Sequence, residues 1–272
     1  MSGARIEARF AALAEEGRAA FAPYVVAGDP DGETSWRILE GLAGAGADLI
    51  ELGLPFSDPM ADGPSIQRGA VRALAAGMTV DGVLGLARRF RDLDAATPLV
   101  LMGYYNPILN RGLESFAAAA AAAGVDGLIV VDLPPEEADP LADALDAHDI
   151  RLIRLATPTT DENRLQVIAR RAQGFVYVVS VAGVTGTREA DPAAISPLVS
   201  DVRGACKLPV AVGFGIRTPT RAAEVARIAD AAVLGTALVD EIAAEIALKR
   251  DPVPKVLALA SAMAQAVRFA RA

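Results

Sequence analysis

The chain has 272 residues, of which 53% are hydrophobic and 22% charged, so it holds ample material for a buried core. Its formal net charge of -8 and pI of about 4.8 disfavour nucleic acid as the main partner, because such a surface repels a phosphate backbone. A single cysteine, Cys206, and a single histidine, His148, exclude an intramolecular disulfide and a Cys/His metal cluster.

The N-terminal segment, residues 1–21, carries acidic residues at helical spacing and has no apolar core of signal length. It therefore predicts an amphipathic helix and not a targeting peptide. No apolar run reaches the roughly 18 to 20 residues that a membrane span needs. We expect a soluble, cytoplasmic protein without membrane contact.

Short apolar runs rich in β-branched residues alternate along the chain with longer Ala-, Arg- and Glu-rich stretches of helical periodicity. The expected strands are 20–26, 48–53, 98–104, 127–132, 150–155, 175–180, 209–214 and 231–235. The expected helices are 33–45, 64–75 with 80–93, 111–123, 136–147, 161–173, 192–202, 218–229 and 253–271, and a further helix starts at 235.

The pattern of these elements favours a closed barrel. Most of the expected strands are nearly continuous apolar runs, which is typical of parallel strands covered on both faces. Eight β/α units in about 250 residues fit a barrel better than an open doubly wound sheet. The open sheet would usually carry a GxGxxG fingerprint after its first strand, where this chain has AGDPDGE (27–33). We predict an α/β fold, a single (β/α)8 TIM barrel domain over residues 1–272 with an extra N-terminal helix.

Two carboxylates lie near the end of the second expected strand, and barrel active sites lie at the C-terminal ends of strands. Glu51 is embedded in the apolar run DLIELGLP, where burial should raise its pKa and suit it to general acid–base work. Asp62 follows eleven residues later in a loop. The alternatives are an ion-paired structural carboxylate at Glu51 and an ordinary turn and helix start at Asp62.

Glycines gather after the last three expected strands, where they let the backbone approach an anion closely. The helix that starts at 235 adds aligned N–H donors, and Thr236 adds a hydroxyl. Loops after the seventh and eighth strands are the usual phosphate site of this fold, so the sequence predicts a phosphomonoester substrate. The glycines are Gly183, Gly186, Gly213, Gly215 and Gly235.

The remaining singular residues carry weaker signals. His148 and Cys206 precede expected strands, on the face that serves stability, and Trp36 falls in a helix where packing is its expected role. Three tyrosines lie at or near the tops of strands, where each could hold an aromatic substrate or pack in the core. These are Tyr24, Tyr104 and Tyr177.

Seven segments resemble, in order, motifs of the tryptophan synthase alpha subunit family. They are VAGDPD (26–31), ELGLPFSDPMADGPSIQ (51–67), LMGYYNPIL (101–109), GVDGLIVVDLPPEE (124–137), SVAGVTGTR (180–188), VGFGI (212–216) and VLGTALV (233–239). The resemblance covers roughly residues 20–245, and the segments 51–67 and 180–188 are its most specific parts.

The resemblance implies a retro-aldol cleavage of indole-3-glycerol phosphate into indole and glyceraldehyde 3-phosphate. Glu51 matches the proton donor and acceptor, and Asp62 matches the carboxylate that holds the indole N–H. No metal or organic cofactor is implied in this chain. The phosphate-binding positions would be Gly186, Gly215, Gly235 and Thr236.

The resemblance also implies an indole pocket, a lid and a partner. Thr185 would close over the site and orient Asp62. The family's partner is a pyridoxal-phosphate-containing beta subunit in an alpha2beta2 assembly, which receives the indole for L-tryptophan synthesis. The pocket positions would be Tyr24, Tyr104, Ile129, Tyr177 and Phe214. The positions facing the beta subunit would be Asp58, Pro59, Asn106 and Pro134.

Three departures from the family pattern are modest: Tyr24 replaces a phenylalanine, Thr236 a serine, and Val181 an arginine or leucine. A rival barrel, indole-3-glycerol phosphate synthase, would need a catalytic lysine on a strand, and none of the lysines lies at a strand C-terminus. They are Lys207, Lys249 and Lys255. A stand-alone lyase and a catalytically inactive activator subunit stay open, although the presence of both Glu51 and Asp62 argues against inactivity.

Overall fold

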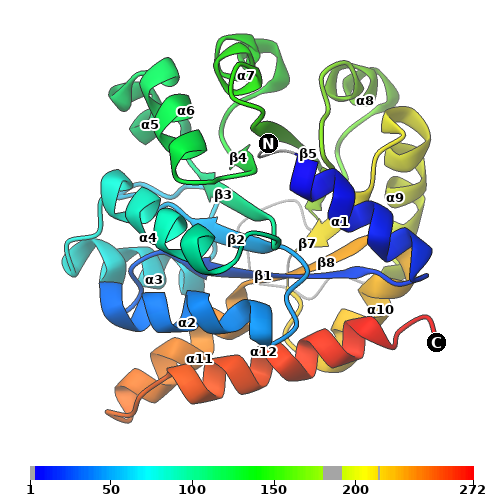
Figure 1. The fold of residues 1–272 in the computed structure, drawn as a ribbon. Coiled ribbons are helices and arrows are strands. Elements are labelled where there is room, and N and C mark those ends of the chain that lie inside the picture. The colour runs from blue at the N-terminus through cyan, green and yellow to red at the C-terminus, as the bar shows by residue number, and fades with distance from the viewer. Residues whose placement is uncertain (1–3, 180–191, 214) are drawn as a thin grey trace.

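The computed structural model describes residues 4–179, 192–213 and 215–272. Eight parallel strands follow one another in chain order and close into a barrel, with β1 hydrogen-bonded to β8 (Figure 1). The predicted (β/α)8 TIM barrel is confirmed. The strands are β1 (Ala20–Val26), β2 (Ile50–Gly53), β3 (Leu99–Gly103), β4 (Gly127–Val130), β5 (Arg151–Ala156), β6 (Val176–Val179), β7 (Val210–Gly213) and β8 (Ala231–Leu234).

Helices surround the barrel on its outside (Figure 1). In chain order they are α1 (Ala4–Glu15), α2 (Gly32–Gly44), α3 (Pro64–Ala75), α4 (Val80–Leu93), α5 (Tyr105–Arg111), α6 (Leu113–Ala122), the short 3-10 helix η1 (Pro135–Glu137), α7 (Asp139–Asp146), α8 (Glu162–Ala169), α9 (Pro192–Cys206), α10 (Pro219–Ile228), α11 (Thr236–Ala247) and α12 (Val253–Arg268). In the part of the chain described, no single helix is long and apolar enough to cross a membrane, although the bent pair α3 and α4 meets those criteria together.

The helix expected at 111–123 is wrong at its start. Two helices, α5 and α6, occupy this region, and Gly112 separates them with a φ of +88° that side-chain-bearing residues rarely adopt. The expected helix began at 111 and left out α5, whose Pro107 lies in the first turn, where a proline costs no helical hydrogen bond. The expected helix at 136–147 is likewise divided, into η1 and α7.

The extra N-terminal helix, α1, closes one end of the barrel. Its Ile6, Phe10 and Leu13 are buried in the same cluster as the side chains that fill the barrel interior. The Phe10 ring lies 5.7 Å from the ring of Phe175. Arg5 pairs with the buried Asp126 at 2.7 Å and so fixes the helix to the start of β4. A ligand must therefore enter from the other end, where the strands finish.

Alternation along the strands decides which side chains face the barrel axis. On β2, Ile50 and Leu52 belong to the core between barrel and helices, so Glu51 faces inward. Tyr24 of β1 pairs in register with Glu51 and therefore lies beside it. Two side chains that are far apart in sequence are thus brought to the same level of the barrel.

Candidate active site

Glu51 is a carboxyl group buried inside the barrel. It is 0% exposed, and neither of its carboxyl oxygens has a partner among the residues that the structure describes. Burial raises its pKa to about 8. The alternative of an ion-paired structural carboxylate therefore finds no support in the described residues, and Glu51 is largely protonated at neutral pH.

Asp62 is held in a different environment, in the loop between β2 and α3. The Tyr104 hydroxyl donates to its Oδ2 at 3.0 Å and itself accepts from the backbone N–H of Ala61 at 3.0 Å. Gln67 donates to the Asp62 carbonyl at 2.9 Å. Burial raises the pKa of Asp62 to about 6, and the hydrogen bond from Tyr104 opposes that rise. Asp62 is therefore mostly ionised at neutral pH while Glu51 is not.

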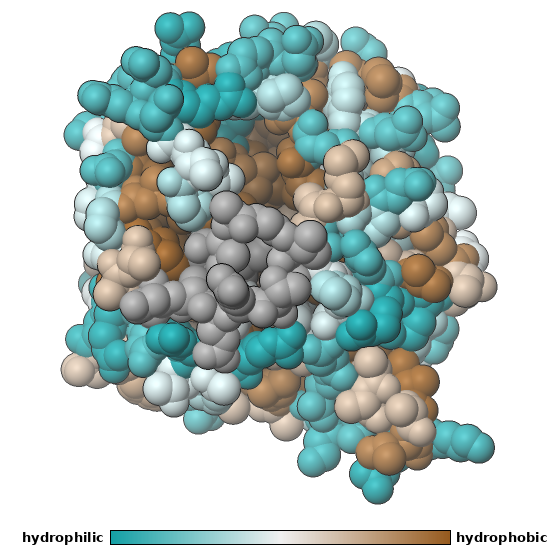
Figure 2. Space-filling model, turned by 180° about the vertical axis from the view of Figure 1, so that it is seen from behind, coloured by the Kyte–Doolittle hydropathy of each residue, from teal (hydrophilic) through white to brown (hydrophobic). Residues whose placement is uncertain are grey.

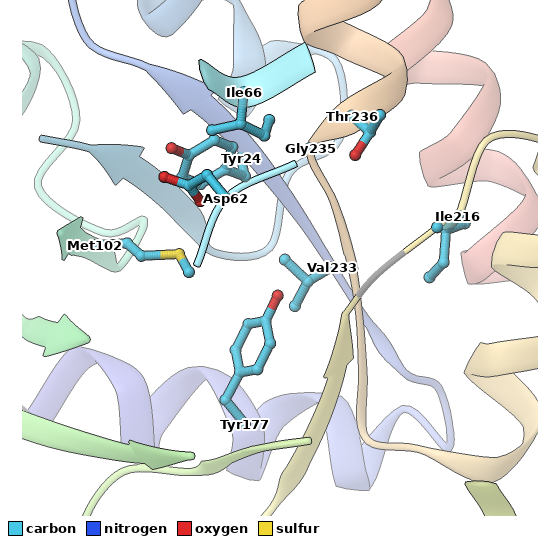
Figure 3. Close-up of a pocket in the computed structure, with 10 residues that line it drawn as sticks. Tyr24, Asp62, Ile66, Met102, Tyr177, Ile216, Val233, Gly235 and Thr236 are labelled. Atoms are coloured by element: carbon cyan, nitrogen blue, oxygen red, sulfur yellow. The ribbon is translucent and has the colours of Figure 1, made fainter. Parts of the chain in front are cut away.

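One cavity at the open end of the barrel brings together six of the site residues predicted from the sequence. Figure 3 shows Asp62 beside Tyr24 on one side, with Tyr177 pointing in from the other. Burial raises the pKa of both tyrosine hydroxyls well above its ordinary value, and the charges of Asp62 and Glu51 add to the rise. The cavity is lined by Tyr24, Asp62, Ile66, Met102, Tyr177, Gly215, Ile216, Val233, Gly235 and Thr236.

One side of the cavity could bind a phosphate through backbone N–H groups. It is formed by Gly215, Gly235 and Thr236. Gly235 and Thr236 open α11, so its first N–H groups point toward incoming anions. A Cβ at Gly235 would lie 2.8 Å from Cδ1 of Tyr24, so only glycine fits here without displacing that ring. The cavity thus has an aromatic part near Asp62 and a backbone-lined part at α11.

The structure gives four outcomes for the predicted pocket and phosphate residues. The cavity brings together Tyr24, Asp62, Tyr177, Gly215, Gly235 and Thr236. Ile129 is fully buried among the side chains inside the barrel and does not line this cavity, so its place in an indole pocket stays a prediction. Tyr104 contributes through its bond to Asp62. Thr185, Gly186, Phe214, Val181 and Gly183 lie outside the described residues.

Four apolar lining residues were missed in the sequence: Ile66, Met102, Ile216 and Val233. Met102 and Val233 lie on expected strands, and strand alternation could have assigned them to the interior. Trp36, His148 and Cys206 lie where the sequence placed them. Trp36 is buried, and its ring packs 3.9 Å from the Arg89 guanidinium. His148 is exposed, and Cys206 ends α9. In the described ranges no group of three or more His, Cys, Asp or Glu side chains could hold a metal ion.

The positions expected to face a partner surround the same end of the barrel. Asp58, Asn106 and Pro134 are exposed on the segments that follow β2, β3 and β4, and Pro59 is half-buried. Two large apolar side chains are exposed nearby, Met60 at 73% and Leu109 at 52%. Figure 2, which views the molecule from behind, shows apolar residues gathered around a hollow on this face.

The fold and the site define a (β/α)8-barrel enzyme with a protonated carboxyl group buried inside its barrel and an ionised one in the cavity at its open end. Residues 10–268 match the family model described as tryptophan synthase alpha chain. The chain belongs to this family, whose members are lyases that cleave indole-3-glycerol phosphate.

Relatives of high identity span the whole chain. The tryptophan synthase alpha chain of Phenylobacterium zucineum is 65% identical over 100% of this chain and 98% of its own length, and that of Acidiphilium cryptum is 55% identical over 98% of each. The crystal structure of tryptophan synthase subunit alpha from Legionella pneumophila has a TM-score of 0.90 at 42% identity, covering 97% of this chain and 98% of that one. A chain of Mycobacterium tuberculosis tryptophan synthase has a TM-score of 0.89 at 35% identity, with the same shares covered.

Proposed function

We propose that this chain cleaves indole-3-glycerol phosphate with Glu51 and Asp62 as the two groups that act on the indole and glycerol atoms. The observation that carries the proposal is a pair of carboxyl groups with different protonation states, Glu51 inside the barrel beside Tyr24 and Asp62 in the cavity that Tyr24 also lines. Burial holds the pKa of Glu51 near 8, while the less buried, Tyr104-bonded Asp62 has a pKa of about 6. One group can therefore give a proton at a pH where the other carries a negative charge.

The steps balance with these two groups alone. The Glu51 carboxyl protonates indole C3, and the ring nitrogen takes up the positive charge, which the Asp62 carboxylate stabilises by accepting the indole N–H. The Glu51 carboxylate then removes the proton of the hydroxyl on the carbon attached to the ring. The C–C bond breaks, its electron pair returns to the ring, and the aldehyde forms. Because the ring itself takes up the electron pair, the reaction requires no metal or organic cofactor.

The cavity suits both ends of this substrate. The indole would lie between Tyr24 and Tyr177, within reach of Asp62, and the phosphate would bind at Gly235, Thr236 and Gly215. Gly186, which the family resemblance adds to the phosphate site, lies outside the described residues. Tyr24 adds a hydroxyl to the indole side of the pocket.

The direct test is an assay of purified protein with indole-3-glycerol phosphate. We expect indole and glyceraldehyde 3-phosphate to be released in equal amounts. If no indole forms above the level given by Glu51→Gln protein, either alone or with a beta subunit, the chain is an inactive activator subunit and the proposal fails.

The two pKa values predict how the reaction depends on pH. As pH rises through about 6, Asp62 ionises and kcat/KM should rise. As pH rises further through about 8, Glu51 loses the proton it must donate and kcat/KM should fall. The profile should be a bell with its maximum between these values. Stopped assays in overlapping buffers would measure it, and a profile that keeps rising beyond pH 9 would contradict the role of Glu51 as proton donor.

We also propose that the chain works in the cytoplasm as the alpha subunit of an alpha2beta2 complex with a pyridoxal-phosphate-containing beta subunit. Indole is small and uncharged, so a cell that released it freely would lose it. The exposed apolar side chains Met60 and Leu109, beside Asp58, Pro59, Asn106 and Pro134, mark a surface suited to a protein partner. We treat residues 1–272 as one domain that docks through this surface.

Docking should order the loop that carries Asp62, so the beta subunit should raise indole formation at least about tenfold, which needs only about 1.4 kcal/mol. Leu109→Ser should weaken this activation without changing the slow rate of the isolated chain, because Leu109 lies on α5, outside the Asp62 loop. Leu93→Ser, which alters a residue 65% exposed at the end of α4, is the matched control and should activate normally. An isolated chain that already runs at full speed and ignores the beta subunit would favour the stand-alone lyase.

A further inference from the structure

Arg154 is a buried cation on the outer side of the barrel. It lies on β5 between Ile153, which belongs to the barrel interior, and Leu155, so its side chain points outward toward the helices. It is 6% exposed, and within residues 4–179, 192–213 and 215–272 it makes no side-chain hydrogen bond or ion pair. The other arginine of this strand, Arg151, is by contrast paired with Glu7 at 2.7 Å.

The side chain lines a cavity that opens where two strands separate. β4 and β5 pair from Gly127 with Arg151 to Ile129 with Ile153, and the register stops there. Beyond that point a cavity lies between the strands, η1 and α8, distinct from the substrate cavity beside β1 and β8. It is lined by Val130, Val131, Asp132, Leu133, Pro134, Pro135, Leu152, Ile153, Arg154, Leu155 and Arg164.

The other charged side chains around this cavity pair with groups other than Arg154. Arg164 pairs with Glu136, and Asp132 accepts a hydrogen bond from the backbone N–H of Tyr105 at 2.8 Å. Arg171 pairs with three aspartates of α7 on the outside, at 3.0 Å or less. Two of these, Asp139 and Asp146, attract Arg154 electrostatically, but neither lies within ion-pair distance of it.

A guanidinium that is mostly buried and has no ion pair within the described residues is costly, because an arginine keeps its charge and burial reduces the water that solvates it. Burial is the main reason that the pKa of Arg154 is lowered, and the neighbouring charge of Arg171 adds to the effect. Arg154 lines the cavity with N–H donors that no described residue uses, and their fork geometry matches two oxygens of one anion.

We propose that this cavity binds a small oxyanion, a carboxylate or a phosphate group, on the guanidinium of Arg154. The site lies outside the reaction chamber and takes no part in the cleavage. The bound anion supplies the negative charge beside Arg154 that no described residue provides. Binding should therefore stabilise the folded chain. The competing explanation is structural: the acidic face of α7 could neutralise Arg154 at a distance and leave no need for a ligand.

The test follows the Arg154 side chain itself. The Nε–H signal of Arg154 in a ¹⁵N NMR spectrum is identified by its loss in Arg154→Met protein. Phosphate, acetate and chloride are then titrated at equal ionic strength. We expect a saturable shift with phosphate or acetate, the more effective of the two naming the class of ligand, and none with chloride. A shift that is absent, or that grows linearly for all three salts, overturns the proposal.

Thermal unfolding gives a second measurement, because an arginine with a purely structural role would not make the Tm depend on the anion. The Tm of the native chain and of the matched control Arg151→Met should rise with the effective anion. Arg154→Met protein should start at an equal or higher Tm and lose the anion-dependent rise that is specific to this cavity. Comparing the variants cancels any effect of phosphate at Gly235. If Arg154→Met lowers the Tm equally with and without anion, Arg154 is a structural partner of α7 and the site does not exist.

Discussion

Glu51→Gln is expected to lower the turnover of indole-3-glycerol phosphate at least about 10²-fold, the low end for the loss of a general acid–base group. The amide keeps the shape of the side chain but can neither give nor take the proton. Because Glu51 faces the barrel interior and does not hold the phosphate, KM should change much less than kcat. Steady-state assays with and without the beta subunit would measure both. Glu245→Gln, which alters a buried glutamate of α11, is the matched control and should keep its turnover within about twofold.

The Glu51→Gln variant should be folded and more stable than the native chain. Its loss of activity could then not be explained by unfolding. In the native chain the pKa of Glu51 is raised from 4.5 to about 8, so its contribution to stability is fully present below about pH 4.5 and is lost as pH rises toward 8. The glutamine variant has no such loss. It should match the native chain near pH 4.5 and exceed it by a few kcal/mol above pH 8, since each pKa unit corresponds to about 1.4 kcal/mol. Denaturant unfolding across this range checks the sign, and a variant that is less stable at high pH would contradict the burial argument.

Gly235→Asp is expected to weaken the binding of glycerol phosphate analogues at least about 10²-fold, because like charges brought together cost several kcal/mol. Two effects contribute. Any Cβ at this position would lie 2.8 Å from Tyr24 and force that ring to move, and the aspartate adds a negative charge at the start of α11. Isothermal titration calorimetry with such an analogue would measure the loss.

Two comparison variants separate these effects. Gly235→Ala adds only the Cβ, so it should weaken binding less than about tenfold through crowding against Tyr24. Gly85→Asp adds the same charge at an exposed position of α4 with open space around it, and it should bind the analogue normally. If Gly235→Asp and Gly235→Ala bind the analogue equally well, the phosphate lies elsewhere.

Local sequence was enough for most of the architecture. Continuous apolar runs of strand length mark parallel strands whatever surrounds them, so all eight strands were found, with ends displaced by a few residues. The exceptions occurred where local signals conflict. The helix expected at 111–123 left out α5, which begins at Tyr105 and holds Pro107 in its first turn, where a proline is compatible with a helix. The glycines and the aspartate that follow strands were expected to meet because a barrel brings the ends of all its strands to one mouth, and Asp62, Gly215 and Gly235 line one cavity.

The sequence by itself thus determined the order of strands and helices, the closed barrel, and the family motifs that name Glu51, Asp62 and the phosphate loops. Only the tertiary structure decided that Tyr104 bonds to Asp62, that Arg154 lines a cavity, and that neither Glu51 nor Arg154 has a side-chain partner among the described residues. The physical reason is that the position of a strand or helix depends mainly on residues that are close together in the sequence. The pKa or pairing of a buried group depends instead on the water and dipoles that distant segments remove or supply when they pack around it.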